Sequence, residues 1–310
     1  MSDPSNPIPG AFRESRSVRT AAIPTSRRMY WLIRRELWEN RSIYIAPLAA
    51  GALALAGFLI SATHLPARMR LAMELGPMQQ QELIEQPYTF AALLIMGTAF
   101  IVSLFYCLDA LHGERRDRSI LFWKSLPISD LATVLSKASV PLLILPVLTF
   151  AIIAATQAIM LLLSTAILLA SGLGAAVLWS RLSFVQMSIM LLYHLLVIHG
   201  LWYAPIYGWL LLVSAWAQRA AFLWASIPLL AIAIVEKIAF NTTRFGSMLV
   251  NRLGGGPEGA PFDSAVMSMH PLLQLTPGRF LISPGLWIGL ALMTACLAGA
   301  VRLRHTRESI

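Results

Sequence analysis

Six long stretches of this chain carry no Asp, Glu, Lys or Arg, and they limit what it can fold into. They are residues 42–67, 86–108, 138–180, 182–218, 220–235 and 280–301. An α-helix rises 1.5 Å per residue, so about 20 residues cross the hydrocarbon core of a bilayer. None of the stretches alternates apolar and polar residues as a strand does, and a helix satisfies its own backbone in lipid. We therefore predict an all-α integral membrane protein.

The number of crossings depends on the two longest stretches, 138–180 and 182–218, each of which has room for one span or two short ones. Gly172 and Gly174 predict a break near residue 172, and Pro205 predicts a kink. One span from each stretch gives six transmembrane helices, near residues 43–63, 88–110, 140–168, 185–214, 220–240 and 282–302. Splitting only one stretch would move the C-terminal arginines across the membrane, whereas splitting both stays an open alternative.

The basic residues orient these helices. With the N-terminus in the cytoplasm, 17 of the 24 Lys and Arg residues fall on the cytoplasmic side, as expected from the excess of basic residues in cytoplasmic loops. Both termini are then cytoplasmic, in a multi-pass protein of a bacterial inner membrane. The net charge of +9 is explained by this topology, so we predict no binding of nucleic acid.

Three segments flank or connect the spans. Residues 1–26 are polar and rich in Pro and Arg, which is typical of a disordered cytoplasmic tail, and residues 304–310 form a second tail. In residues 27–41 the side chains of Met29, Leu32, Ile33 and Leu37 share one helical face, which predicts an amphipathic helix at the membrane interface. The alternative is a plain extension of the first span.

The predicted cytoplasmic loop, residues 112–137, mixes charges of both signs with an aromatic cluster that includes Phe122 and Trp123. Such a mixture favours docking onto another protein, although a solvated loop is the alternative. Pro127 ends the helix expected here, and Ser129 is placed to cap the next one.

Two stretches resemble ABC-2 type transporter permeases: GERRDRSILFWKSLPISD at 113–130 and LWYAPIYGWLLLVSAWAQRAAFLWASIP at 201–228. The resemblance implies a homodimeric permease, usually an exporter, that binds two copies of a cytoplasmic ATPase. It also implies that ATP and Mg²⁺ belong to that partner and that lipid surrounds the chain. The expected ATPase contacts are Glu114, Arg115, Arg116, Asp117, Arg118, Phe122, Trp123, Lys124 and Pro127.

The phosphate-binding loop of ATPases needs the pattern G-x-x-x-x-G-K-[ST]. The chain has only three lysines, Lys124, Lys137 and Lys237, and none follows that pattern. We therefore expect no ATP hydrolysis and no cofactor in this chain. A membrane enzyme and an ion-coupled secondary transporter stay as alternatives, although we find neither a nucleophile–base pattern nor an internal repeat.

Several side chains that carry polar groups fall at membrane depth in the fourth span, where such groups usually face other helices or a cavity. The candidate translocation path is Tyr193, His199, Trp202, Tyr203 and Tyr207. Hydrogen bonding between helices is the alternative role. His194 and His199 are five residues apart, a poor spacing for two metal ligands on an α-helix, so we predict no metal site.

Overall fold

The computed structural model describes residues 25–116, 129–174, 176–181, 184–254 and 281–306, and over these ranges it is helical with no strand. Six helical segments are long and apolar enough to cross a membrane, the number predicted from the sequence. They are Ser42–Ala62, Pro77–Arg116, Asp130–Ala170, Phe184–Trp202, Ala221–Phe240 and Pro284–Thr306. The chain thus has the character of a multi-pass membrane protein.

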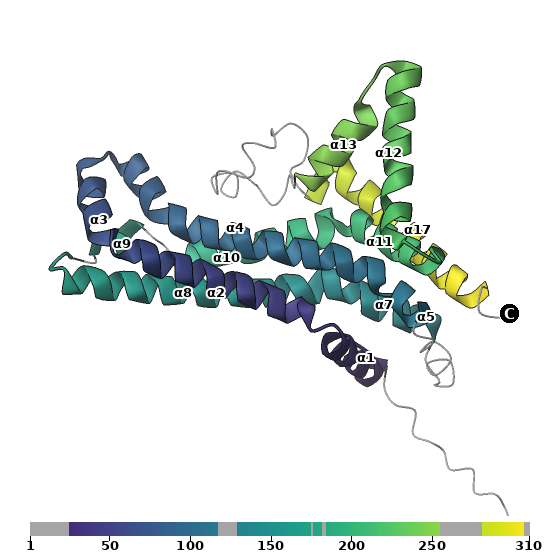
Figure 1. The fold of residues 1–310 in the computed structure, drawn as a ribbon, viewed down its shortest axis with the longest axis horizontal. Helices are drawn as coiled ribbons and strands as arrows, with labels where there is room; N and C mark the ends of the chain where they lie inside the picture. The colour runs from purple at the N-terminus through teal and green to yellow at the C-terminus, as the bar shows by residue number, and fades with distance from the viewer. Residues whose placement is uncertain (1–24, 117–128, 175, 182–183, 255–280, 307–310) are drawn as a thin grey trace, which may run out of the picture.

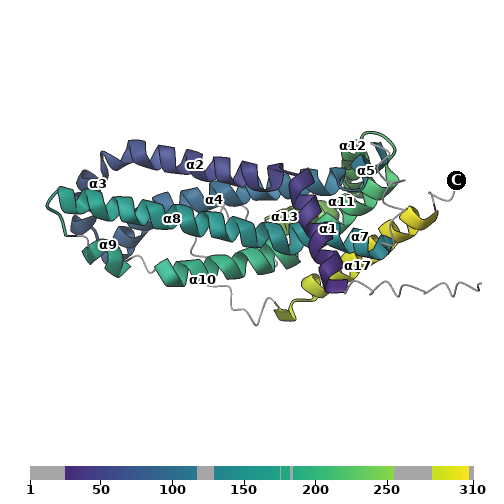
Figure 2. The ribbon, with the colours of Figure 1, turned by 90° about the horizontal axis from the view of Figure 1, so that it is seen from below.

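Three long helices form the body of the molecule and run side by side (Figures 1 and 2). They are α2 (Ser42–Ala62), α4 (Pro77–Asp109) and α8 (Leu145–Ala170). α4 continues through α5 (His112–Arg116), and α8 is preceded by α7 (Asp130–Ser139) and by a π-helix, η1 (Val140–Ile144). At 1.5 Å per residue, Pro77–Arg116 is about 60 Å long, twice the hydrocarbon thickness, so this body is longer than a bilayer core is thick.

The two ends of the body differ in their helices (Figure 1). One end carries α3 (Leu65–Glu74) and α9 (Ala176–Arg181), and the other carries α1 (Thr25–Glu39), α5 and α7. The expected break near residue 172 is present, because α8 ends at Ala170 and Gly172 adopts a φ of 69°. Only glycine takes that conformation without steric cost.

The predicted fourth span is divided in the structure. α10 (Phe184–His194) passes into a second π-helix, η2 (Leu195–Trp202), which ends at Tyr203. α11 (Ala204–Trp216) then begins, with Pro205 in its first turn, where the missing N–H of proline costs nothing. The bend expected at Pro205 is therefore a boundary between two helices.

α12 (Ala221–Phe240) runs across the direction of the body and away from it (Figures 1 and 2). Of its 20 residues only Ala221 and Ala225 are buried. α13 (Arg244–Leu253) returns toward the body, and the Glu236 carboxylate caps its start by accepting from the N–H groups of Arg244 and Phe245. A single copy of the chain therefore leaves most of an apolar helix uncovered.

The last helix, α17 (Pro284–Thr306), packs along α11. Its close approach uses Gly208, where a Cβ would lie 3.1 Å from the Cα of Met293. The predicted start of the C-terminal tail at residue 304 is wrong, because α17 continues to Thr306 and Arg304 is only 6% exposed. Arg304 is buried because it pairs with acidic residues of two other helices.

Candidate functional site

A network of buried charges joins four helices at the α1 end of the molecule. Lys137 of α7 places its Nζ 2.9 Å from the Glu36 carboxylate of α1 and 3.1 Å from the Glu114 carboxylate of α5. Arg304 of α17 lies 2.7 Å from Glu114 and 2.9 Å from Asp130. Segments far apart in the sequence are therefore connected by ion pairs.

The members of this network are shielded from solvent. The side chains of Lys137, Glu36, Glu114 and Arg304 are between 2% and 6% exposed. Glu36 also accepts a hydrogen bond of 2.9 Å from the hydroxyl of Tyr106. Buried charges of this kind are tolerated only when they are paired, and removing one partner leaves the other uncompensated.

The position of Glu114 differs from the one expected from the sequence. We expected it among the charged contacts for an ATPase, but its carboxylate points inward, toward Lys137 and Arg304. Two acidic and two basic side chains from different helices attract one another more strongly inside the protein than in water, and this explains the orientation.

Arg115 also makes contacts within the chain. Its guanidinium donates to the backbone carbonyl of Ser214 and, at 2.9 Å, to that of Ala217. The Ser214 hydroxyl in turn accepts from the backbone N–H groups of Leu111 and His112. Arg115 therefore satisfies carbonyl groups at the C-terminus of α11, a common role for arginine at a helix end.

Of the remaining predicted docking residues, Arg116 is exposed at the end of α5. Ser129 caps α7 as predicted, because its hydroxyl accepts from the N–H of Ala132 at 3.2 Å. The other predicted contacts lie outside the described residues, and their docking role stays a prediction. They are Asp117, Arg118, Phe122, Trp123, Lys124 and Pro127.

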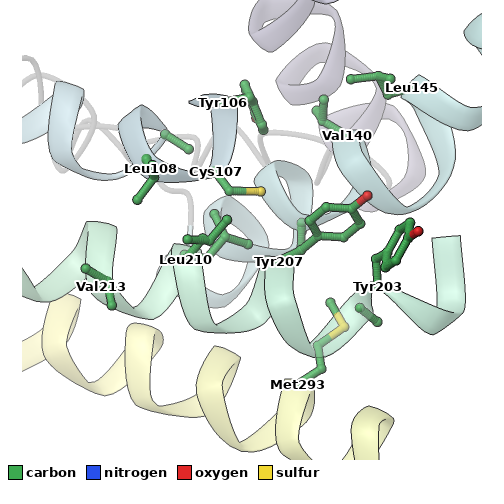
Figure 3. Close-up of a cluster of buried hydrophobic side chains, with 14 of the residues drawn as sticks. Tyr106, Cys107, Leu108, Val140, Leu145, Tyr203, Tyr207, Leu210, Val213 and Met293 are labelled. Carbon is green, nitrogen blue, oxygen red and sulfur yellow. The ribbon is translucent and has the colours of Figure 1, made fainter. Parts of the chain in front are cut away.

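The residues of the candidate path lie around η2 and α11. Trp202, Tyr203 and Tyr207 are between 1% and 7% exposed and belong to one apolar cluster. Figure 3 shows the two tyrosines between α4, which contributes Cys107, and α17, which contributes Met293. A path past these side chains therefore requires the helices to separate from their positions in this conformation.

The two π-helices contact each other at a point where a glycine is needed. A Cβ on Gly200 of η2 would lie 2.7 Å from the carbonyl oxygen of Leu142 in η1. No real Cβ comes that close to a carbonyl oxygen without a shift of the backbone. π-helical turns interrupt the regular hydrogen bonding of a helix and are frequent at functional sites.

Polar atoms without partners gather in the same region. The hydroxyl of Tyr193 and the Nδ1 atoms of His194 and His199 are buried without a hydrogen-bond partner. The His199 ring makes edge contacts with Phe100 and Tyr203, at centroid distances of 6.2 Å and 5.4 Å. Among the path residues predicted from the sequence, Tyr193 and His199 thus have polar atoms to offer a ligand.

Arg252 anchors the end of α13 against the η2–α11 junction. Its guanidinium lies 4.0 Å from the ring centroid of Trp202 and donates to the carbonyls of Trp202 and Gly285. The Tyr203 hydroxyl donates to the Leu253 carbonyl at 2.9 Å. Burial lowers the pKa of Arg252, although an arginine stays charged at any physiological pH.

Comparisons with protein-family models, with curated proteins and with solved structures give no match to this chain.

Proposed function

We propose that this chain is the membrane-spanning permease subunit of an ABC-2 type ATP-driven transporter. Two copies of the chain work as a homodimer with two copies of a separate cytoplasmic ATPase, and they export a substrate. The six apolar helices and the resemblance of residues 113–130 and 201–228 to that family support the proposal. ATP and Mg²⁺ are bound by the ATPase, so this chain needs no cofactor and does not hydrolyse ATP.

The observation that carries the proposal is the buried charge network around Glu114. This residue stands at the start of the charged and aromatic segment that we expect to contact the ATPase. Its ion pairs reach α7 through Lys137 and α17 through Arg304, and Lys137 extends the connection to α1 through Glu36. A force applied at this segment is therefore passed to three helices at once, as rigid-body switching requires.

The orientation proposed from the basic residues puts the α1 end at the cytoplasmic face of a bacterial inner membrane. Four exposed side chains of α1 suit the lipid headgroup zone. Tyr30, Trp31 and Trp38 are more than half exposed, and the Arg34 guanidinium lies 5.1 Å and 5.2 Å from the two tryptophan rings. Amphipathic aromatic rings and basic groups prefer this zone, so α1 is proposed as an interfacial helix.

The exposed apolar side of α12 is proposed to contact lipid and the second copy of the permease. The ten largest exposed apolar side chains of α12 are Phe222, Leu223, Trp224, Ile227, Leu230, Ile232, Ile234, Val235, Ile238 and Phe240. So large an apolar surface is stable in lipid or in a protein interface and costly in water. Substrate passes between the helices when the Tyr203 and Tyr207 contacts open.

ATP hydrolysis by the assembled transporter tests the proposal. We expect Glu114→Gln to lower the ATPase rate of the complex in lipid nanodiscs at least about tenfold, equivalent to about 1.4 kcal/mol, while the complex stays assembled. Glu82→Gln is the matched control, because Glu82 is exposed near the start of α4, at the opposite end of the body from Glu114. It should change the rate less than about twofold, since exposed charges contribute little. If the unchanged protein, Glu114→Gln and the control variant all support the same rate of ATP hydrolysis, the proposed coupling is ruled out.

A further inference from the structure

Two histidine rings approach each other because of the π-helix. His194 directly precedes η2, and His199 lies within it. In an α-helix, residues five apart point about 140° away from each other. The i→i+5 pattern of a π-helix instead brings them one above the other. The ring centroids of His194 and His199 are 5.7 Å apart, with an angle of 52° between the rings.

The chain from His194 to His199 is therefore not a regular α-helix, and the two histidines can share a ligand although they are five residues apart. Both Nδ1 atoms are buried and have no hydrogen-bond partner, and His199 is only 9% exposed. A buried polar atom without a partner costs about 1–3 kcal/mol. Two such atoms on neighbouring rings indicate that a ligand offsets this cost.

The surroundings restrict the charge of that ligand. Phe100 and Tyr203 flank the His199 ring, and the described residues contain no group of three or more His, Cys, Asp or Glu placed to hold a metal ion. The ligand set is therefore two imidazole nitrogens with no carboxylate to balance charge. The Born cost of burying an ion grows with the square of its charge, so a divalent ion costs about four times as much as a monovalent one.

Coordination number restricts the ligand further. Zn²⁺ in proteins takes about four ligands, and Mg²⁺ and Ca²⁺ take six or more oxygen atoms. Imidazole binds copper well, and Cu(I) is monovalent and stable with two ligands in line. We propose that His194 and His199 bind one Cu(I) ion through their Nδ1 atoms. The site belongs to this chain alone, so binding needs neither the ATPase nor a transport cycle.

The test is Cu(I) binding to the purified full chain in detergent without oxygen, in competition with a chromophoric Cu(I) chelator. We expect one Cu(I) per chain, with X-ray absorption showing two nitrogen neighbours and no sulfur. His199→Gln and His194→Gln should each raise the dissociation constant at least about 100-fold. Replacing a residue that only orients a metal ligand typically weakens binding about 10–100-fold, and replacing the ligand itself should weaken it more. His64→Gln is the control, because His64 is exposed in the turn between α2 and α3, and it should leave binding unchanged.

Four outcomes would overturn the proposal: no Cu(I) bound, binding unchanged in both variants, sulfur neighbours in the absorption spectrum, or preference for Zn²⁺. Sulfur neighbours would indicate Cys107, Cys296 or methionines instead. The two variants guard against misfolding, because His194 is less buried than His199 and its replacement disturbs the packing less. Thermal unfolding of each variant shows whether lost binding reflects a lost ligand or a lost fold.

Discussion

Replacing Lys137 tests whether the buried charge network holds the α1 end together. Lys137→Met shortens the side chain by one atom and removes its charge, so the Glu36 and Glu114 carboxylates lose the ammonium group at 2.9 Å and 3.1 Å. Breaking a buried pair by removing one partner costs about 3–5 kcal/mol. Glu36 keeps the Tyr106 hydroxyl and Glu114 keeps Arg304, so we expect the lower part of that range, about 3 kcal/mol.

The assay is reversible unfolding in mixed micelles, followed by circular dichroism, with the free energy of unfolding extrapolated to zero denaturant. Glu36→Gln and the double variant Glu36→Gln with Lys137→Met complete a mutant cycle. We expect a coupling energy of about 1–3 kcal/mol, because the two side chains are in direct contact. In the double variant only Glu114 loses a charged partner. The double variant should therefore lose less free energy of unfolding than the two single variants lose in total.

Glu82→Gln is the control for this cycle, since Glu82 is exposed near the start of α4, and substitutions at such surface positions usually change the stability by less than about 0.5 kcal/mol. If Lys137→Met costs less than about 1 kcal/mol, like an ordinary surface change, the network does not stabilise the fold as argued. A coupling energy near zero would likewise refute the ion pair between Glu36 and Lys137.

Three further substitutions, one of them with a matched control, test other parts of the structure by the free energy of unfolding. Gly200→Ala should lower the free energy of unfolding by about 1–3 kcal/mol, because the new Cβ would lie 2.7 Å from a carbonyl oxygen. Gly97→Ala is the control: a Cβ at this position has open space around it, so the substitution should be neutral or stabilising by up to about 1 kcal/mol. Ser129→Ala should cost about 1 kcal/mol through loss of the α7 cap, and an unchanged stability would contradict the cap. Arg252→Gln should cost about 1–2 kcal/mol, since it removes the contact with the Trp202 ring.

The number of long apolar helices was predictable because it follows from charge-free stretches, a local property of the chain. The same holds for the cap at Ser129 and the break at Gly172, which depend on one or two residues and the chemistry of a turn. The boundaries were less accurate. α4 begins at Pro77 and includes Glu82 and Glu85, which lie before the uncharged stretch at residues 86–108.

The charge network was missed because ion pairs between distant residues are not encoded locally. Lys137 is separated from Glu36 by 101 positions, and Arg304 from Glu114 by 190. One signal was present: Glu36 lies one helical turn after Leu32, on the apolar face of the predicted amphipathic helix. A carboxylate on that face predicts a buried basic partner. The π-helices have no comparable signal, because their extra residue per turn is stabilised by packing between η1 and η2.

The central claim is that this chain is driven by a separate ATPase, and affinity purification from membranes of the natural host tests it most directly. With a tag on this chain, native mass spectrometry should find two copies of it with two copies of an ATPase that carries a phosphate-binding loop. Trp123→Asp should release the ATPase, and Trp179→Asp, on the exposed side of α9 at the opposite end, should retain it. Recovery of the intact, folded chain without any ATPase would contradict the account.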